Sequence, residues 1–274
     1  MFLRKFTTLV MKVTEADVPA LLTESRDLSV TDFLAWALNR FEPQGQAPTL
    51  AFASSLGLED QLLLSYLDGA LAGFPQPSAR IHAFTLDTGR LNPETYDLMQ
   101  INRERYRLTL ASYWPEAPAV EALVALGGPN LFYDSVENRK ACCGVRKVAP
   151  LNRALAGRDA WITGLRRAQS VTRTGLERVE WDGAHALVKL NPLIDWTLDE
   201  VKSALEDRNV PVNALHAQGY PSLGCAPCTR AVKPGEDERA GRWWWEDADK
   251  KECGIHVSTE IPTPKKTFTF GKAI

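Results

Sequence analysis

Residues 49–60 have the sequence TLAFASSLGLED. The apolar run at its start predicts a buried strand, and the apolar residues at helical spacing from Leu62 onward predict the helix that follows. Ser54, Ser55 and Gly57 lie in the short loop between the two. A loop of small residues between a strand and a helix points backbone N–H groups at an anion. Loops of this kind also occur without a phosphate, so other motifs must decide what this one binds.

The rest of the chain continues the alternation of strands and helices. Apolar runs predict further strands at residues 81–86, 107–110 and 159–164, and a hairpin about Asp182 and Gly183. Helical spacing and capping residues predict helices at residues 29–41, 62–71, 120–126, 145–155 and 197–208. This alternation predicts an α/β fold with a mainly parallel sheet.

Charged residues follow several of the predicted strands, where open α/β sheets bind ligands. Asp87 begins the turn DTGR, which suits either the rim of a ligand pocket or a plain strand-to-helix connection. Arg166 and Arg167 follow another strand and form either an anion clamp or a solvated loop. Arg239 and Arg242, three residues apart, either bind an anion from one face or form surface salt bridges. Charge alone leaves these alternatives open.

The chain has 274 residues, 45% of them hydrophobic, and a formal net charge of −2. No sustained linker divides it, so we expect one domain at residues 28–245, an N-terminal segment at 1–27 and a mobile C-terminal segment at 246–274. The small net charge indicates neither nucleic acid nor a membrane surface as a partner, and no apolar run is long enough to span a bilayer. We expect a cytoplasmic protein, and the sequence leaves its oligomeric state open, a homo-oligomer included.

The five cysteines fall in three short stretches. Cys142 and Cys143 are adjacent, Cys225 and Cys228 form a CxxC pair, and Cys253 stands by itself. Adjacent cysteines form a disulfide only with strain, whereas the CxxC spacing directs two thiolates toward one centre. Four such ligands suit a four-iron four-sulfur cluster or zinc, and buried free cysteines are the third interpretation. The fifth thiol is then left as a reactive sulfur.

Three motifs together resemble a known family. They are KxCCxxRKxxPL at residues 140–151, CxxC at residues 225–228 and ECGxH at residues 252–256. This set resembles the assimilatory adenylylsulfate (APS) reductases of the phosphoadenylylsulfate (PAPS) reductase family, over residues 52–256. Relatives that use PAPS commonly keep the ECGxH cysteine and lack the other four.

The resemblance implies a fold of the adenine-nucleotide alpha-hydrolase type, with a modified pyrophosphatase-type (PP) loop. It implies a 4Fe-4S cluster bound by Cys142, Cys143, Cys225 and Cys228. It also implies that the substrate is bound by Ser54, Ser55, Gly57, Asp87, Lys147, Arg166 or Arg167, Arg239 and Arg242.

The implied reaction is part of sulfate assimilation and cysteine biosynthesis. Cys253 attacks the sulfur of adenylylsulfate, AMP leaves, and a thiosulfonate remains on the cysteine. Thioredoxin or a thioredoxin-like protein then releases sulfite. Two alternatives remain: a reductase that uses PAPS or both nucleotides, and a cluster-bearing nucleotide sensor without turnover.

Overall fold

The computed structural model describes residues 13–43, 45, 47–169, 175–247 and 261–263. The described part contains a six-stranded sheet with strand order β3-β2-β1-β4-β6-β5. Neighbouring strands are parallel, except that β5 and β6 are antiparallel. The strands are β1 Leu50–Ser54, β2 His82–Leu86, β3 Ala111–Tyr113, β4 Ala160–Ile162, β5 Val179–Asp182 and β6 Leu187–Leu190. The predicted α/β fold with a mainly parallel sheet is confirmed.

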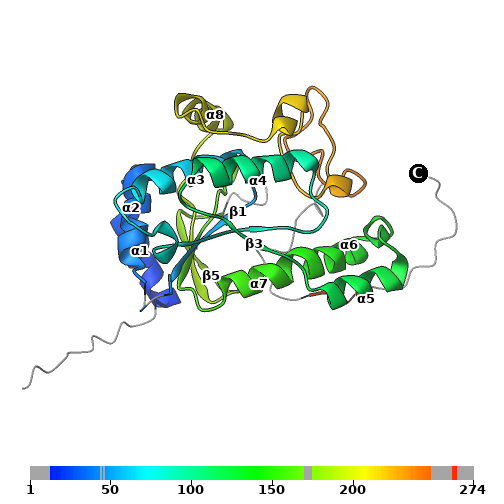
Figure 1. Cartoon of the computed structure of the whole chain (residues 1–274), viewed down its shortest axis with the longest axis horizontal. Coiled ribbons are helices and arrows are strands. Elements are labelled where there is room, and N and C mark those ends of the chain that lie inside the picture. Colours follow the sequence, from blue (N-terminus) through cyan, green and yellow to red (C-terminus); the bar gives the residue numbers. More distant parts are fainter. Residues whose placement is uncertain (1–12, 44, 46, 170–174, 248–260, 264–274) are drawn as a thin grey trace, which may run out of the picture.

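Helices cover both faces of the sheet, with α3 and α4 on one side and α6 and α7 on the other (Figure 1). The α-helices are α1 Val18–Ser25, α2 Val30–Arg40, α3 Leu58–Ala70, α4 Pro93–Arg105, α5 Ala117–Gly127, α6 Val136–Cys143, α7 Ala149–Leu155 and α8 Leu198–Asp207. Phe52 of β1 packs in the larger core with residues of α2, α3 and α8, whereas its neighbour Ala51 packs with Leu151 of α7. The two neighbours belong to different cores because successive side chains of a strand point to opposite faces.

Local signals in the sequence place several elements correctly. Ser29 accepts a hydrogen bond from the Asp32 N–H and begins α2, and Thr197 with Glu200 forms the capping box of α8. The hairpin of β5 and β6 is also confirmed.

The strand predicted at residues 107–110 is wrong, because β3 begins only at Ala111. The backbone N–H groups of Arg107 and Leu108 both donate to Asp68 Oδ1, at 2.9 and 3.0 Å. Donors already bound to a side chain do not pair with β2, so the ladder starts four residues after the predicted beginning of the strand.

Helices α6 and α7 are joined by a π-helical turn, Gly144–Val148, into one helical run from Val136 to Leu155. The sequence predicts that Pro150 kinks or interrupts a helix at this place. The run continues through Pro150, which lies in the first turn of α7, directly after the π-helical turn. Single π-helical turns are frequent at functional sites.

The segment before residue 28 packs on the domain where it is described. Val13 and Leu21 belong to the larger core, and α1 contacts β5. None of the helices in the described ranges is both long enough and apolar enough to cross a membrane.

Candidate functional site

A cavity of about 220 Å³ lies at the carboxyl ends of β1, β2 and β4. This is the edge where parallel α/β sheets bind ligands. Six of the nine predicted substrate-binding residues line it: Ser54, Ser55, Gly57, Lys147, Arg239 and Arg242. The structure therefore brings together residues that are almost 190 positions apart in the sequence.

The loop after β1 is held by a buried carboxylate that lines the same cavity. Asp60 accepts hydrogen bonds from the Ser55 N–H at 2.6 Å and from the Ser55 hydroxyl at 2.5 Å. The Leu56 N–H donates to Ser54 Oγ at 3.2 Å, and Leu56 adopts a left-handed backbone with φ 63°. Burial raises the pKa of Asp60 to about 6, against the lowering effect of the Ser55 hydrogen bonds. The donors of Ser55 are thus directed at Asp60 rather than at the cavity.

Two further carboxylates belong to this wall. A Cβ atom at Gly164 would lie 2.3 Å from Asp60 Oδ1 and 2.9 Å from Glu59 Cβ, so only glycine allows this close approach. Arg166 is 1% exposed, and its guanidinium contacts Glu59 at 2.7 Å and Glu238 at 3.4 Å. Glu59 and Glu238 line the cavity, so Arg166 supports this wall from behind.

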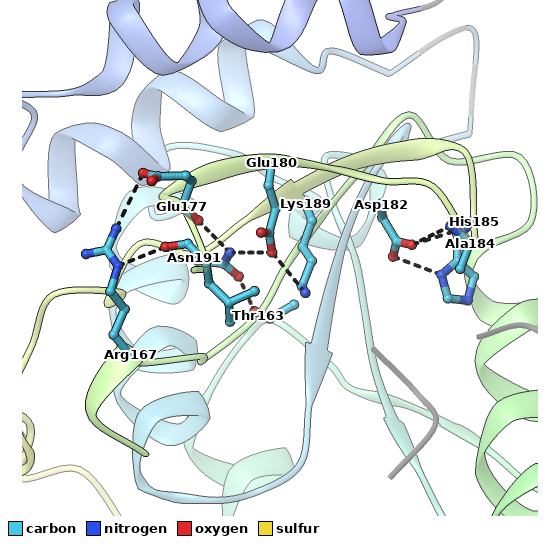
Figure 2. A network of polar contacts seen from close by, with 10 residues as sticks. Thr163, Arg167, Glu177, Glu180, Asp182, Ala184, His185, Lys189 and Asn191 are labelled. Atoms are coloured by element: carbon cyan, nitrogen blue, oxygen red, sulfur yellow. Dashed lines mark hydrogen bonds and ion pairs between the residues drawn. The ribbon is translucent and has the colours of Figure 1, made fainter. Parts of the chain in front are cut away.

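Arg167 points toward Glu177, beside β5 (Figure 2). Its Nε donates to the Leu176 carbonyl at 2.8 Å, and its guanidinium forms ion pairs with Glu177, at 3.4 Å, and with Asp195. Arg167 is not among the residues that line the cavity. Its contact with a substrate stays a prediction, and the structure places Arg166 nearer to the cavity.

Asp87 is fully buried and holds the turn that follows β2. Its Oδ1 accepts hydrogen bonds from the Gly89 N–H at 2.8 Å and from the Tyr96 hydroxyl at 3.0 Å. The neighbouring Thr88, not Asp87, lines the cavity. In this arrangement Asp87 shapes the turn, and its contact with a substrate stays a prediction.

The lining of the cavity also has a basic part, which we call the basic wall: Lys147, Arg239 and Arg242. Arg242 is 6% exposed, and its Nη1 donates to the Leu223 carbonyl at 2.6 Å. A Cβ at Gly224 would lie 2.4 Å from Arg242 Nη2, so this glycine makes room for the guanidinium. Lys147 and Arg239 also line the cavity. Three cations around one cavity favour an anionic ligand.

The four cysteines of the two pairs lie together beside this basic wall. They are buried, are not in disulfides, and pack in one cluster with Trp243. Burial raises the pKa of Cys228 to about 12, while Lys147 and Arg242 lie close enough to oppose the shift. Bound metal would remove this cost, because a coordinating thiol gives up its proton. The donor set therefore fits a metal or cluster that takes four thiolates.

Among the described residues, no group of three or more His, Cys, Asp or Glu side chains is arranged around a single metal ion. Zinc needs its ligands around one centre, whereas each cysteine of a four-iron cluster binds a different iron. The predicted nucleophile Cys253 lies outside the described residues.

A second polar network lies on β6 and β5 (Figure 2). Lys189 pairs with Glu180 at 3.0 Å, and Asn191 Nδ2 donates to the same carboxylate at 3.1 Å. Asn191 Oδ1 accepts from the Thr163 hydroxyl at 2.6 Å, and Thr163 lines the cavity. The network thereby fixes the end of β4 at the cavity wall.

Sequence reasoning assigned no role to Glu59, Asp60 or Glu238. The first two directly follow the small-residue loop, but a carboxylate beside a proposed anion site contradicts simple charge matching. Their roles depend on partners distant in the chain, Gly164 and Arg166, which no local pattern indicates.

Comparisons with known proteins agree with this site. A model of the phosphoadenosine phosphosulfate reductase domain matches residues 49–231. A relative from Burkholderia cepacia, named adenosine 5'-phosphosulfate reductase, is 53% identical over 213 residues, which cover 78% of this chain and 82% of the relative. A relative of the same name from Allochromatium vinosum is 45% identical over 247 residues, which cover 89% and 91%.

Among solved structures, the phosphoadenylyl-sulfate reductase of Candida auris, crystallised as a phosphate complex, matches with a TM-score of 0.65 and 26% identity, covering 81% of this chain and 99% of that one. The FMN adenylyltransferase of Candida glabrata matches with a TM-score of 0.50 at 16% identity, covering 92% of this chain and 81% of that one, which shows a shared fold alone. From the domain match and the identity of these relatives, the chain belongs to the phosphoadenosine phosphosulfate reductase family.

Proposed function

We propose that this protein reduces adenylylsulfate to sulfite and AMP. One observation carries the proposal: Thr88 lines the cavity, and its hydroxyl lies 3.2 Å from the buried Cys225 Sγ. The anion-binding wall and the four-cysteine cluster are therefore parts of one site. Two relatives that match this chain over most of their own length are named adenosine 5'-phosphosulfate reductase. These names support adenylylsulfate as the substrate over other compounds.

In this proposal the phosphosulfate binds to the basic wall. Lys147, Arg239 and Arg242 neutralise its charge, and the nucleoside extends toward the carboxyl ends of β1 and β4. Ser55 contributes donors only when Asp60 releases them, because both groups of Ser55 that can donate are bound to that carboxylate. Arg166 then serves as a positioning residue through Glu59 and Glu238.

The chemistry takes two steps. The Cys253 thiolate attacks the sulfate sulfur, an S–S bond forms, the bond from sulfur to the phosphate oxygen breaks, and AMP leaves. A thiol of a thioredoxin-like protein then attacks the Cys253 sulfur, which releases sulfite and leaves a mixed disulfide. A second thiol of that protein resolves the disulfide, so the dithiol supplies both electrons.

We further propose that Cys142, Cys143, Cys225 and Cys228 hold a 4Fe-4S cluster. Their burial in one cluster of residues and the absence of disulfides among them support this assignment. When bound, the cluster would tie together the two chain segments that carry its ligands and set the charge beside Lys147.

The test compares both nucleotides on anaerobically purified protein. We expect about four iron and four sulfide per chain, a higher kcat/KM with APS than with PAPS, and no sulfite from Cys253→Ser. Sulfur-35-labelled APS without thioredoxin should leave one sulfonate on the peptide that contains Cys253, and reduced thioredoxin should release it. Equal or reversed preference supports the alternative, a PAPS or dual-specificity reductase. Stoichiometric zinc without sulfide would refute the cluster.

A further inference from the structure

One hydroxyl group in the cavity lining has a partner that decides what it can offer a ligand. Thr163 directly follows β4, lines the cavity and is 3% exposed. It lies two residues after Trp161, which also lines the cavity, so the two side chains share one face of the sheet. The Thr163 hydroxyl is 2.6 Å from Asn191 Oδ1 (Figure 2).

The partners of Asn191 fix the orientation of its amide. Asn191 is fully buried, and its Nδ2 lies 2.8 Å from the Glu177 carbonyl oxygen and 3.1 Å from the Glu180 carboxylate. That carboxylate is ion-paired with Lys189, so both partners of Nδ2 are acceptors. If the amide were turned round, its oxygen would face two acceptors. Asn191 Oδ1 therefore faces Thr163, and the Thr163 hydroxyl gives its only hydrogen to it.

The other donors around Thr163 are also bonded within the protein. The Thr163 N–H donates to the Leu190 carbonyl at 2.9 Å. The Gly164 N–H and both donors of Ser55 go to Asp60. No residue in the described ranges donates to Thr163 Oγ1, so both lone pairs of this oxygen are left as acceptors. This corner of the cavity therefore suits a ligand group that donates a hydrogen bond.

We propose that Thr163 is a specificity residue that recognises the nucleoside by accepting a hydrogen bond from a neutral donor, either a ribose hydroxyl or the amino group of the base. The inference rests on the proposed function, in which an adenine nucleotide fills the cavity. A phosphosulfate carries acceptors alone and does not fit this corner, whereas it suits the basic wall. The two ends of the cavity thereby orient the nucleotide, with its anionic end at Arg239 and Arg242 and its nucleoside at Thr163.

The apolar part of the lining supports a nucleoside at this position. Four large hydrophobic side chains line the same cavity: Phe84, Leu86, Leu151 and Trp161. Ligand pockets are mostly apolar, and a few polar groups in them fix the orientation of the ligand. A purine base has an apolar face for these side chains. An analogue without the matching donor leaves Thr163 Oγ1 unpaired in a buried site, and sites of this kind discriminate strongly.

The test measures nucleotide binding by titration calorimetry on the full, anaerobically purified chain, without turnover. The ligands are AMP and three analogues that each lack one donor: 2′-deoxy-AMP, 3′-deoxy-AMP and IMP, whose base carries an oxo group in place of the amino group. We expect the parent protein to bind one analogue about 5- to 100-fold more weakly than AMP, and that analogue identifies the donor. In Thr163→Val this ratio should fall at least about fivefold, whereas Thr163→Ser, which keeps the hydroxyl, should preserve it.

The matched control is Thr85→Val in β2. Thr85 is 2% exposed and does not line the cavity, so this change should leave all three ratios as they are. Each ratio compares ligands on one protein, so a lower melting temperature of Thr163→Val, whose Asn191 loses a donor, does not enter it. Should Thr163→Val not fold, Thr163→Ala removes the same hydroxyl and takes its place.

The outcomes separate this inference from the proposed function. Equal ratios in the parent protein and in Thr163→Val overturn the role of Thr163, and so does a parent protein that binds AMP and all three analogues equally well. Both results leave the proposed function standing, because AMP still binds. A parent protein that binds no AMP contradicts the proposed function and this inference together.

Discussion

Replacing Asp60 by asparagine tests how the loop after β1 is held. Asp60 is buried in the cavity wall, receives the Ser55 N–H and hydroxyl, and abuts Gly164. Its folded-state pKa, about 6, lies above the ordinary 3.8 because burial disfavours the charged form. Between about pH 4 and pH 6 the folded state therefore binds more protons than the unfolded chain. The free energy of unfolding must fall as the pH rises through this window, and the full loss is present above pH 6.

The size of the effect follows from the shift. A difference of roughly two units corresponds to about 3 kcal/mol between pH 3 and pH 8, and roughly half of this lies between pH 5 and pH 8. For a chain of this size, that portion lowers the melting temperature by about 3 °C. The asparagine does not titrate, so this part of the slope should disappear in Asp60→Asn.

The assay is thermal unfolding at a fixed scan rate from pH 5 to pH 8, for the wild type and Asp60→Asn in parallel. The absolute stability of the variant does not test the idea. The amide N–H₂ of the asparagine would face another donor, the Gly164 N–H, and this mismatch lowers the free energy of unfolding by about 1–3 kcal/mol at every pH. The criterion is the slope. Parallel pH profiles for the two proteins would refute a carboxylate that is both buried and titrating near pH 6.

Three other substitutions test the site. Gly164→Ala should destabilise the fold by about 1–3 kcal/mol in urea unfolding, because its methyl group would collide with Asp60. Arg242→Ala should weaken APS binding by roughly 2–5 kcal/mol in titration calorimetry, whereas the control Arg167→Ala should change it by less than about 1 kcal/mol, and equal losses would contradict the assigned walls. Cys143→Ser should lose iron and sulfide together and lower the melting temperature, and full retention of iron would exclude it as a ligand.

Periodicity and capping residues predicted most of the fold. The apolar run before Ser54, the Thr197 capping box and the Asp182-Gly183 turn are local signals, and the structure confirms what each indicated. The prediction of an edge strand at residues 107–110 was wrong for a reason that lies outside those residues. Asp68 in α3 takes two backbone donors of the segment that was predicted to pair. The apolar pattern of a segment cannot show that a distant side chain competes for its backbone N–H donors.

The candidate site likewise contains residues that could be predicted from the sequence and residues that could not. The family resemblance predicted Ser55, Lys147 and Arg242 as substrate-binding residues, and all three line one cavity. The acidic wall could not be predicted, because Asp60 is placed by Gly164, about a hundred residues later, and Glu59 by Arg166. The choice between Arg166 and Arg167 was open for the same reason. Arg166 lies in the loop after β4 and Arg167 begins a short 3-10 helix, so only their packed partners show which of the two lies nearer to the cavity.

The helical run from Val136 to Leu155 explains why these parts depend on one another. Arg139, Cys143 and Lys147 lie at four-residue intervals along it, within about 12 Å of helix axis. The π-helical turn Gly144–Val148 begins directly after Cys143 and contains Lys147, so its extra residue per hydrogen-bonded ring changes where Lys147 points relative to the cysteine. It also brings Pro150 into the first turn of α7, where the run can absorb it. An α-helix without that turn would keep the same motif spacing and direct Lys147 elsewhere. The spacing of the motif is therefore necessary for the site, and the π-helical turn is what converts that spacing into a lysine shared by the thiols and the cavity.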